Sequence, residues 1–166
     1  MPFQIHAIPP TQFLKLFDLS EKELKEQAAR IEIVPDNLGY PCVVSLQDAE
    51  VGERVLLANY MHLPENTPFR ASHAIYVREN AIQKKLEINE VPEMLSSRML
   101  AVRSYDESHL MSAADVVEGM DLAQSINTMF EDDSVRYVHI HIAKPGCYAA
   151  KATRALGAAE TRKSDG

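Results

Sequence analysis

Residues 135–142 alternate aliphatic side chains with other types, and this is the clearest pattern in the chain. Tyr137, His139 and His141 fall at every second position, and aliphatic residues such as Ile140 fill the positions between them. A period of two predicts a β-strand with an aliphatic face and a Tyr-His-His face. We expect the aliphatic face to pack in the core and the strand to lie at the centre of its sheet. The Tyr-His-His face is the first candidate for a functional surface.

Similar patterns predict further strands, at residues 31–34, 41–46, 54–62, 71–78, 99–105 and 110–117. In the strand over 54–62, Tyr60 and His62 share a face. In the strand over 71–78, His73 shares a face with Ile75. Prolines at positions 64 and 68 bracket the loop between these two strands, and the Pro-Asp-Asn-Leu-Gly run at 35–39 predicts a turn.

Three segments carry helix signals. Ser20 and Glu23 form a predicted capping box, which starts a helix that should run from residue 21 to about 30. Pro92 and Glu93 suit a first helical turn within residues 91–98. A third helix is predicted over 122–130, capped by Asp121.

Strands joined by hairpin-length turns, with two or three helices among them, indicate an α+β fold with a mixed, mainly antiparallel sheet. A length of 166 residues fits one domain. We expect this single domain to span residues 1–154, because periodicity is lost beyond them, and residues 155–166 to form a frayed C-terminal tail.

Composition narrows the possible partners. The formal net charge is −7, and the basic clusters are short, which argues against nucleic acid. No apolar run approaches the ~18 residues of a membrane helix, and no signal peptide is apparent, so we expect a cytoplasmic protein without membrane contact. In that compartment Cys42 and Cys147 are expected to be free thiols. Homo-oligomer formation stays open.

Five motifs, taken in order, resemble a small bacterial family catalogued as domain of unknown function 1203. They are Pro41-Cys42 with Ser45-Leu46 and Asp48-Ala49, the run Phe69 to Ile75, the run Asp115 to Gly119, the run Tyr137 to His141, and the run Gly146 to Ala150. The resemblance extends from Phe3 to about Arg154. It implies no activity, substrate, cofactor or functional residue. Members often carry Asn after the second histidine, where this chain has Ile142.

The pair His139 and His141 allows three interpretations. With Cα atoms roughly 6.6 Å apart on one strand face, the two rings could converge on one ion. A third ligand would then come from His62, His73, Asp115 or Glu118. The rings could instead line a small-molecule pocket, or be neutral hydrogen-bonded residues of a half-buried sheet. Because His-x-His alone is a weak metal signature, we assign no metal ligands and no cofactor from the sequence.

Cys147 follows the histidine strand after Gly146 and could open a helical turn or a short strand. At a helix N-terminus beside an imidazole, its thiol would become a usable nucleophile. The alternative is that Cys147 is a small buried hydrophobic residue.

Arg70, Ser72 and His73 lie where a proline-bounded loop enters a strand, and with Tyr137 they could bind an anion. Arg70 could equally pair with an acidic side chain of the chain itself.

Two functional hypotheses follow. In the first, the protein is a small-molecule enzyme in which Cys147, His139 and His141 are catalytic and an arginine-lined pocket holds a small anionic molecule. In the second, it is a non-catalytic ligand-binding or interaction domain in which the histidines and cysteines are structural. The sequence does not decide whether the protein is an enzyme.

Overall fold

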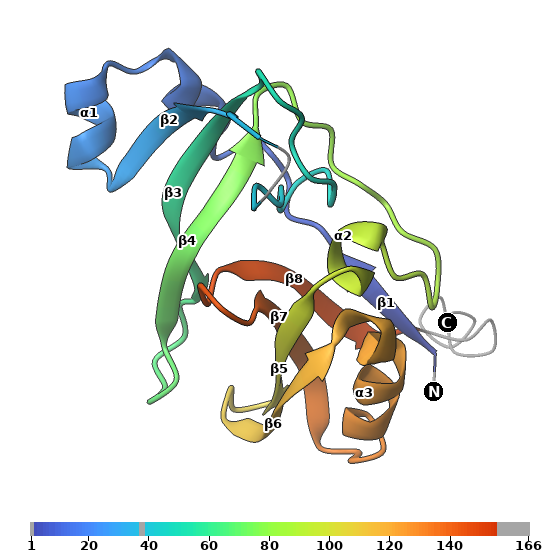
Figure 1. Cartoon of the computed structure of the whole chain (residues 1–166). Helices are drawn as coiled ribbons and strands as arrows, with labels where there is room; N and C mark the ends of the chain where they lie inside the picture. The colour runs from blue at the N-terminus through green and yellow to red at the C-terminus, as the bar shows by residue number, and fades with distance from the viewer. Residues whose placement is uncertain (1, 37–38, 156–166) are drawn as a thin grey trace, which may run out of the picture.

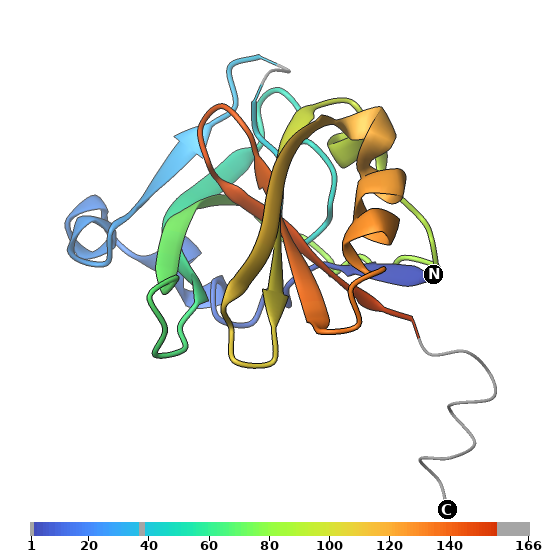
Figure 2. The same ribbon diagram turned by 90° about the horizontal axis from the view of Figure 1, so that it is seen from below.

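The computed structural model describes residues 2–36 and 39–155, and these form two antiparallel sheets with three short α-helices (Figures 1 and 2). This arrangement confirms the predicted α+β fold class. The elements are β1 (Phe3–His6), α1 (Glu21–Glu26), β2 (Ala29–Ile33), β3 (Arg54–Leu63), β4 (Ala71–Arg78), α2 (Glu93–Ser96), β5 (Met99–Asp106), β6 (Met111–Glu118), α3 (Leu122–Met129), β7 (Val135–Ile142) and β8 (Tyr148–Arg154), with 3-10 turns at Leu14–Asp18 and Gly119–Asp121.

The larger sheet has the strand order β1-β8-β7-β5-β6, which puts β7 at its centre, as predicted. Ile140 of β7 lies opposite Val102 of β5 on one side and Ala150 of β8 on the other. Helix α3 covers this face of the sheet, and its Ile126 packs with these residues and with Phe130 in a fully buried core. The aliphatic half of the alternating pattern therefore anchors the strand.

The smaller sheet has the order β2-β3-β4 and its own apolar core. Leu56 of β3 and Ile75 of β4 are buried there together with Leu24 of α1 and Phe13. Tyr148, the first residue of β8, also belongs to this core and contacts the Tyr60 ring at a centroid distance of 5.7 Å. The start of β8 thus links the two sheets.

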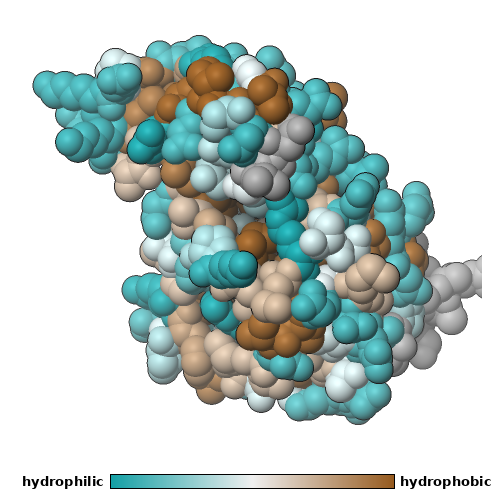
Figure 3. Space-filling model, viewed as in Figure 1, coloured by the Kyte–Doolittle hydropathy of each residue, from teal (hydrophilic) through white to brown (hydrophobic). Residues whose placement is uncertain are grey.

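In Figure 1 the ends of β3 and β4 nearest their connecting loop come down beside β7 and β8. Figure 3, viewed from the same side, shows hydrophobic residues in separate groups among hydrophilic ones over both sheets. The side of the larger sheet that faces away from α3 is therefore the side that meets the smaller sheet.

The strand predicted over residues 41–46 is wrong. Pro41 and Cys42 form only isolated bridges, and the chain turns at once, with the backbone N–H of Leu46 donating to the Cys42 carbonyl. Cys42 and Val44 are fully buried in this turn. An apolar run of this length suits a buried turn as well as a strand, so its hydrophobicity alone was misleading.

The capping box of α1 is confirmed, since the Ser20 hydroxyl accepts from the Glu23 backbone and the Glu23 carboxylate accepts from the Ser20 backbone. The helix ends four residues early, because Ala28 has a left-handed φ of 52° and the next residues pair with β3 as strand β2. Asp121 stands at the N-cap of α3 without a side-chain capping bond, so that predicted cap is wrong. Strand β1 was not predicted.

The turn predicted at 35–39 includes residues 37 and 38, and the predicted tail consists mainly of residues 156–166; both sets lie outside the described residues. Among the helices that are described, none is long and apolar enough to cross a membrane.

Candidate functional site

Four of the six histidines gather where the ends of β3 and β4 meet β7. His139 and His141 come from β7, His62 from β3 and His73 from β4. Alternation puts the β7 pair on the face away from α3, because Ile140 between them points into the α3 core. Three separate strands therefore supply the cluster.

A β-bulge in β3 shapes its contribution. The pairing with β4 shifts by one residue between Tyr60 and Leu63, so β3 carries one extra residue there. Successive residues of a regular strand point to opposite faces. Here both reach the larger sheet, since His62 contacts His139 while Leu63 packs with Tyr105. Bulges that redirect a side chain in this way are common beside functional sites.

Three of the rings form a nearly equilateral triangle. Ring centroids are 4.8 Å apart for His62 and His73, 4.8 Å for His62 and His141, and 4.9 Å for His73 and His141. One ring nitrogen of each residue lies within 4.8 Å of the other two. The shortest contact, 2.7 Å, joins His62 Nε2 and His73 Nδ1. Four-coordinate zinc with bonds of 2.0–2.1 Å needs ligand nitrogens about 3.4 Å apart, so these three can close around an ion with small shifts.

Hydrogen bonds orient the rings. The Gly146 carbonyl can only accept, so His141 must donate to it from Nδ1, at 3.0 Å, and its Nε2 is left with a lone pair. His62 Nδ1 lies 3.2 Å from His139 Nδ1. If His62 donates the proton in this contact, its Nε2 keeps a lone pair with which it can bind a metal ion. The Tyr148 ring stacks on His62 at 5.0 Å and 9°. In metal-binding histidines, the ring nitrogen that does not bind the ion typically donates a hydrogen bond, as His141 Nδ1 does here to Gly146.

Burial keeps these rings neutral at neutral pH. Desolvation is the largest cause that lowers the pKa of His62 to about 4, of His139 to about 2 and of His141 to about 3. Burial also lowers the pKa of His73. Neutral imidazole is the form that binds metal ions.

Arg103 of β5 adds a positive charge to the edge of the cluster. It lies opposite His139 in the pairing of β5 with β7, and its Nη1 is 3.5 Å from His141 Nε2. Its charge contributes to lowering the pKa of His62, His73 and His141. The side chain is half-buried.

Two of the residues predicted to bind a ligand lie outside the cluster's centre. Tyr137 shares the strand face with the histidines, but its hydroxyl hydrogen-bonds His109 Nδ1 at 2.8 Å. Arg70 donates to the Glu65 carbonyl and to the Asn66 side chain within the β3–β4 loop. The structure therefore brings Arg103, and not Arg70, to the histidines.

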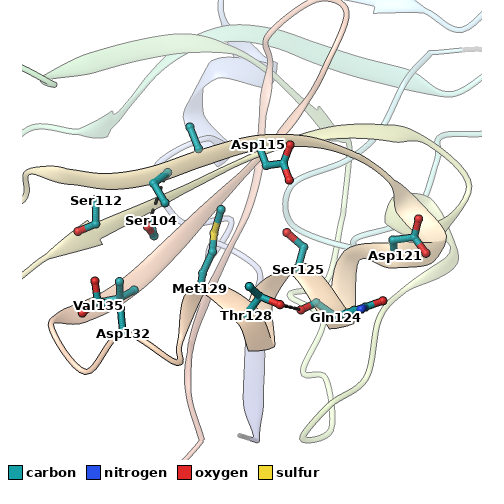
Figure 4. Close-up of a pocket in the computed structure, with 12 residues that line it drawn as sticks. Ser104, Ser112, Asp115, Asp121, Gln124, Ser125, Thr128, Met129, Asp132 and Val135 are labelled. Carbon is teal, nitrogen blue, oxygen red and sulfur yellow. Dashed lines mark hydrogen bonds between the residues drawn. The ribbon is translucent and has the colours of Figure 1, made fainter.

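Of the four residues considered as a third metal ligand, His62 and His73 lie in the cluster. Asp115 instead lines a cleft of about 500 Å³ between β6 and α3 (Figure 4), on the opposite side of the larger sheet. Glu118 is exposed at the end of β6. Ser72 precedes His73 in β4 and so leaves the strand on the other face.

Cys147 does not open a helical turn, because the chain passes from Gly146 directly into strand β8. Its side chain lines a separate cleft of about 460 Å³ with Tyr76, Met99 and Ile142. Burial raises the pKa of the Cys147 thiol, which favours the thiol over the thiolate. Cys147 is connected to the histidines through the preceding residue, Gly146, whose carbonyl accepts a hydrogen bond from His141.

Sequence reasoning missed Arg103, although a signal was present. In the strand predicted over 99–105, Arg103 is the charged residue, and it shares a face with Ala101 and Tyr105. Arg103 lies beside the histidines because β5 pairs with β7, and the sequence did not reveal that pairing.

Residues 39–154 match the model of a family described as "Protein of unknown function (DUF1203)". No curated protein and no solved structure matches the chain.

Proposed function

Since the chain belongs to the DUF1203 family, which brings no known function with it, we propose a function from the site itself: the protein binds a divalent transition-metal ion through His62, His73 and His141. The observation that carries this proposal is the convergence of one ring nitrogen from each of three strands within 4.8 Å. Imidazole ligands suit zinc, copper, iron and nickel.

The ligand atoms follow from the hydrogen bonds. His141 offers Nε2, because its Nδ1 is engaged by Gly146; a bound ion would replace the Arg103 Nη1 that lies 3.5 Å from this Nε2. His62 offers Nε2 and His73 offers Nδ1, the two atoms already in contact. Three protein ligands leave a coordination position free, which is typical of catalytic zinc sites, whereas structural sites are closed by four. The half-buried side chain of His73 keeps this position within reach of solvent.

His139 supports the centre without binding the ion. Its Nδ1 accepts from His62 Nδ1, so it orients that ring much as a carboxylate or carbonyl would. A neutral acceptor in this position leaves the charge of the centre unchanged.

The non-catalytic alternative makes the cluster a purely structural hydrogen-bonded network. In it, His73 Nδ1–H donates to His62 Nε2, and His62 donates onward to His139, which also fits the observed contacts. A metal ion would take the place of the proton between His62 and His73. The enzyme hypothesis based on a Cys147 thiolate finds less support, because that side chain lies in another cleft and burial raises its pKa.

Titration calorimetry of the metal-free protein with Zn²⁺ and Ni²⁺ separates these alternatives. We expect one ion per chain, and a loss of affinity above ~100-fold in each of His62→Gln, His73→Gln and His141→Gln. His139→Gln should cost about 10–100-fold, the usual effect of losing an orienting partner. His6→Gln and His109→Gln are matched controls outside the cluster and should bind like the wild type. Binding that is absent in the wild type, or that survives all three ligand substitutions, would leave the structural network as the better interpretation.

A further inference from the structure

Arg103 sits among small neighbours on the face of the larger sheet that carries the histidines. The residue opposite it on β6 is Ala114, which is exposed, and Ala101 precedes it by two positions on the same face. Burial raises the pKa of the Tyr105 hydroxyl, and the positive charge of the Arg103 guanidinium lowers that pKa by a smaller amount. The guanidinium thus lies beside His141, and the residue directly opposite it on β6 has a small, exposed side chain.

No carboxylate in the described parts of the chain, residues 2–36 and 39–155, forms an ion pair with Arg103. The pairs that are formed join Arg30 to Glu32, Arg54 to Glu79, Arg78 to Glu53, and Arg98 to Asp48. The Arg103 guanidinium is therefore a half-buried cation with imidazole and phenol as its neighbours.

The charge of the metal-loaded centre would be unbalanced. Three neutral histidines contribute no negative charge, so the two charges of the ion and the one of Arg103 are left uncompensated. Lys151, whose Nζ lies 4.5 Å over the Tyr137 ring, adds a further cation on the same face. Partly desolvated charges are costly unless a counter-charge accompanies them.

We propose that Arg103 holds an anionic ligand, through a carboxylate or phosphate group, against the free coordination position of the metal ion; this rests on the proposed metal centre and names the class of molecule that completes it. The planar guanidinium presents parallel N–H donors to two oxygens of such a group. The anion supplies the missing negative charge and an oxygen ligand together. Arg103, and not Arg70, is the group that selects for it.

Cobalt provides a direct readout, because the visible absorption of bound Co²⁺ changes when a ligand enters its coordination sphere. The Co²⁺-loaded protein is titrated with oxalate and, separately, with inorganic phosphate. We expect saturable spectral changes, with an affinity lowered about tenfold to hundredfold in Arg103→Gln, the usual value of hydrogen bonds to a charged group. Arg103→Lys keeps the positive charge but loses the paired N–H donors of the guanidinium, so its anion affinity should lie between those of the wild type and Arg103→Gln. Arg70→Gln is the matched control and should behave like the wild type.

The outcomes separate the anion site from the metal centre. If wild type and Arg103→Gln both take up one Co²⁺ and the variant needs about tenfold to hundredfold more anion for the same spectral change, the proposal holds, and the titrant that binds the wild type more tightly identifies the group. If the wild type binds Co²⁺ but neither anion changes its spectrum, or Arg103→Gln responds equally, the role of Arg103 is overturned while the metal centre stands. If no Co²⁺ binds, both fall.

Discussion

The two faces of the larger sheet use the same strands for opposite purposes. On the α3 side, β5, β7 and β8 present Val102, Ile140 and Ala150, all fully buried among aliphatic neighbours. On the other side, one residue along, β5 and β7 present Arg103, His139 and other polar side chains. Alternation alone separates a core from a site, so the first face can stabilise the fold while the second carries groups that cost stability.

The difference also appears in charge. Within residues 2–36 and 39–155, the buried cluster on the α3 face holds no titratable group, whereas the histidine face holds two buried imidazoles without a carboxylate partner. Burying a polar group costs free energy unless a hydrogen bond compensates for its lost hydration. This contrast favours a binding role for the second face.

The largest expected effect tests the first face. Ile140→Ala removes a fully buried side chain at the centre of the sheet, where α3 and two strands prevent collapse. We expect a loss of about 2–5 kcal/mol in the free energy of unfolding, measured with urea. A loss under roughly half a kcal/mol would mean that β7 is not anchored by this face.

The second prediction is that the histidine face, unlike the α3 face, makes the free energy of unfolding depend on pH. The folded pKa values of His139 (about 2) and His141 (about 3) lie below the unfolded value of about 6.5. Below pH 6.5 the unfolded chain therefore binds protons that the folded chain excludes. The stability is fully present above that pH and falls by up to about 1.4 kcal/mol per pH unit for each histidine as the pH drops.

Urea unfolding of the metal-free protein at pH 7 and pH 5.5 measures this effect, and we expect a difference of about 3 kcal/mol, most of it from His139 and His141 and the rest from the partly exposed His62, whose folded pKa is about 4. His139→Gln should remove roughly a third to a half of the difference. The cost of Ile140→Ala should be the same at both pH values, because its surroundings do not titrate. Equal stability of the wild type at the two pH values would contradict the assignment of neutral, buried histidines.

A smaller effect is expected at Gly146, which has a φ of +81° and whose carbonyl accepts from His141. Alanine there should cost about 1–2 kcal/mol in unfolding free energy through backbone strain. A Cβ would also stand 3.7 Å from the His73 ring. Gly52 is a matched control, since its φ of +88° brings the same strain with nothing within 4 Å of a Cβ. Only Gly146→Ala should weaken Zn²⁺ binding, and equal Zn²⁺ affinities of the two variants would separate Gly146 from the site.

The cysteines provide the smallest test. Both are free, Cys42 is fully buried, and Cys147 is half-buried. In native protein at neutral pH, Cys147 should alkylate slowly, since burial raises its pKa, and Cys42 only after unfolding. Mass spectrometry with iodoacetamide follows both reactions. Fast alkylation of Cys147 that slows in His141→Gln would revive the nucleophile hypothesis.

Most strands could be predicted because alternation reports directly on burial. Residues 71–78 and 135–142 match β4 and β7 to the residue, since one face of each is apolar and buried. The segment 41–46 failed because both faces of its turn are buried, which hides the period. Strand β1 was missed although Phe3 and Ile5 are buried and alternate with Gln4 and His6, because a pattern of four residues is too short to stand out.

The site could be predicted only in part. The sequence singled out His139 and His141 and named His62 and His73 among possible partners, but their convergence depends on a bulge and on how two sheets meet. These are long-range features without a local signal. Arg103 and the acceptor role of Gly146 were missed for the same reason.

X-ray absorption spectroscopy at the zinc edge of the Zn²⁺-loaded protein tests the central claim most directly. Three imidazole nitrogens at about 2.0–2.1 Å are expected in the wild type, with oxygen completing the shell. His141→Gln should show one imidazole fewer, and His109→Gln should match the wild type. A shell of oxygens with one imidazole or none in the wild type would contradict a centre built from His62, His73 and His141.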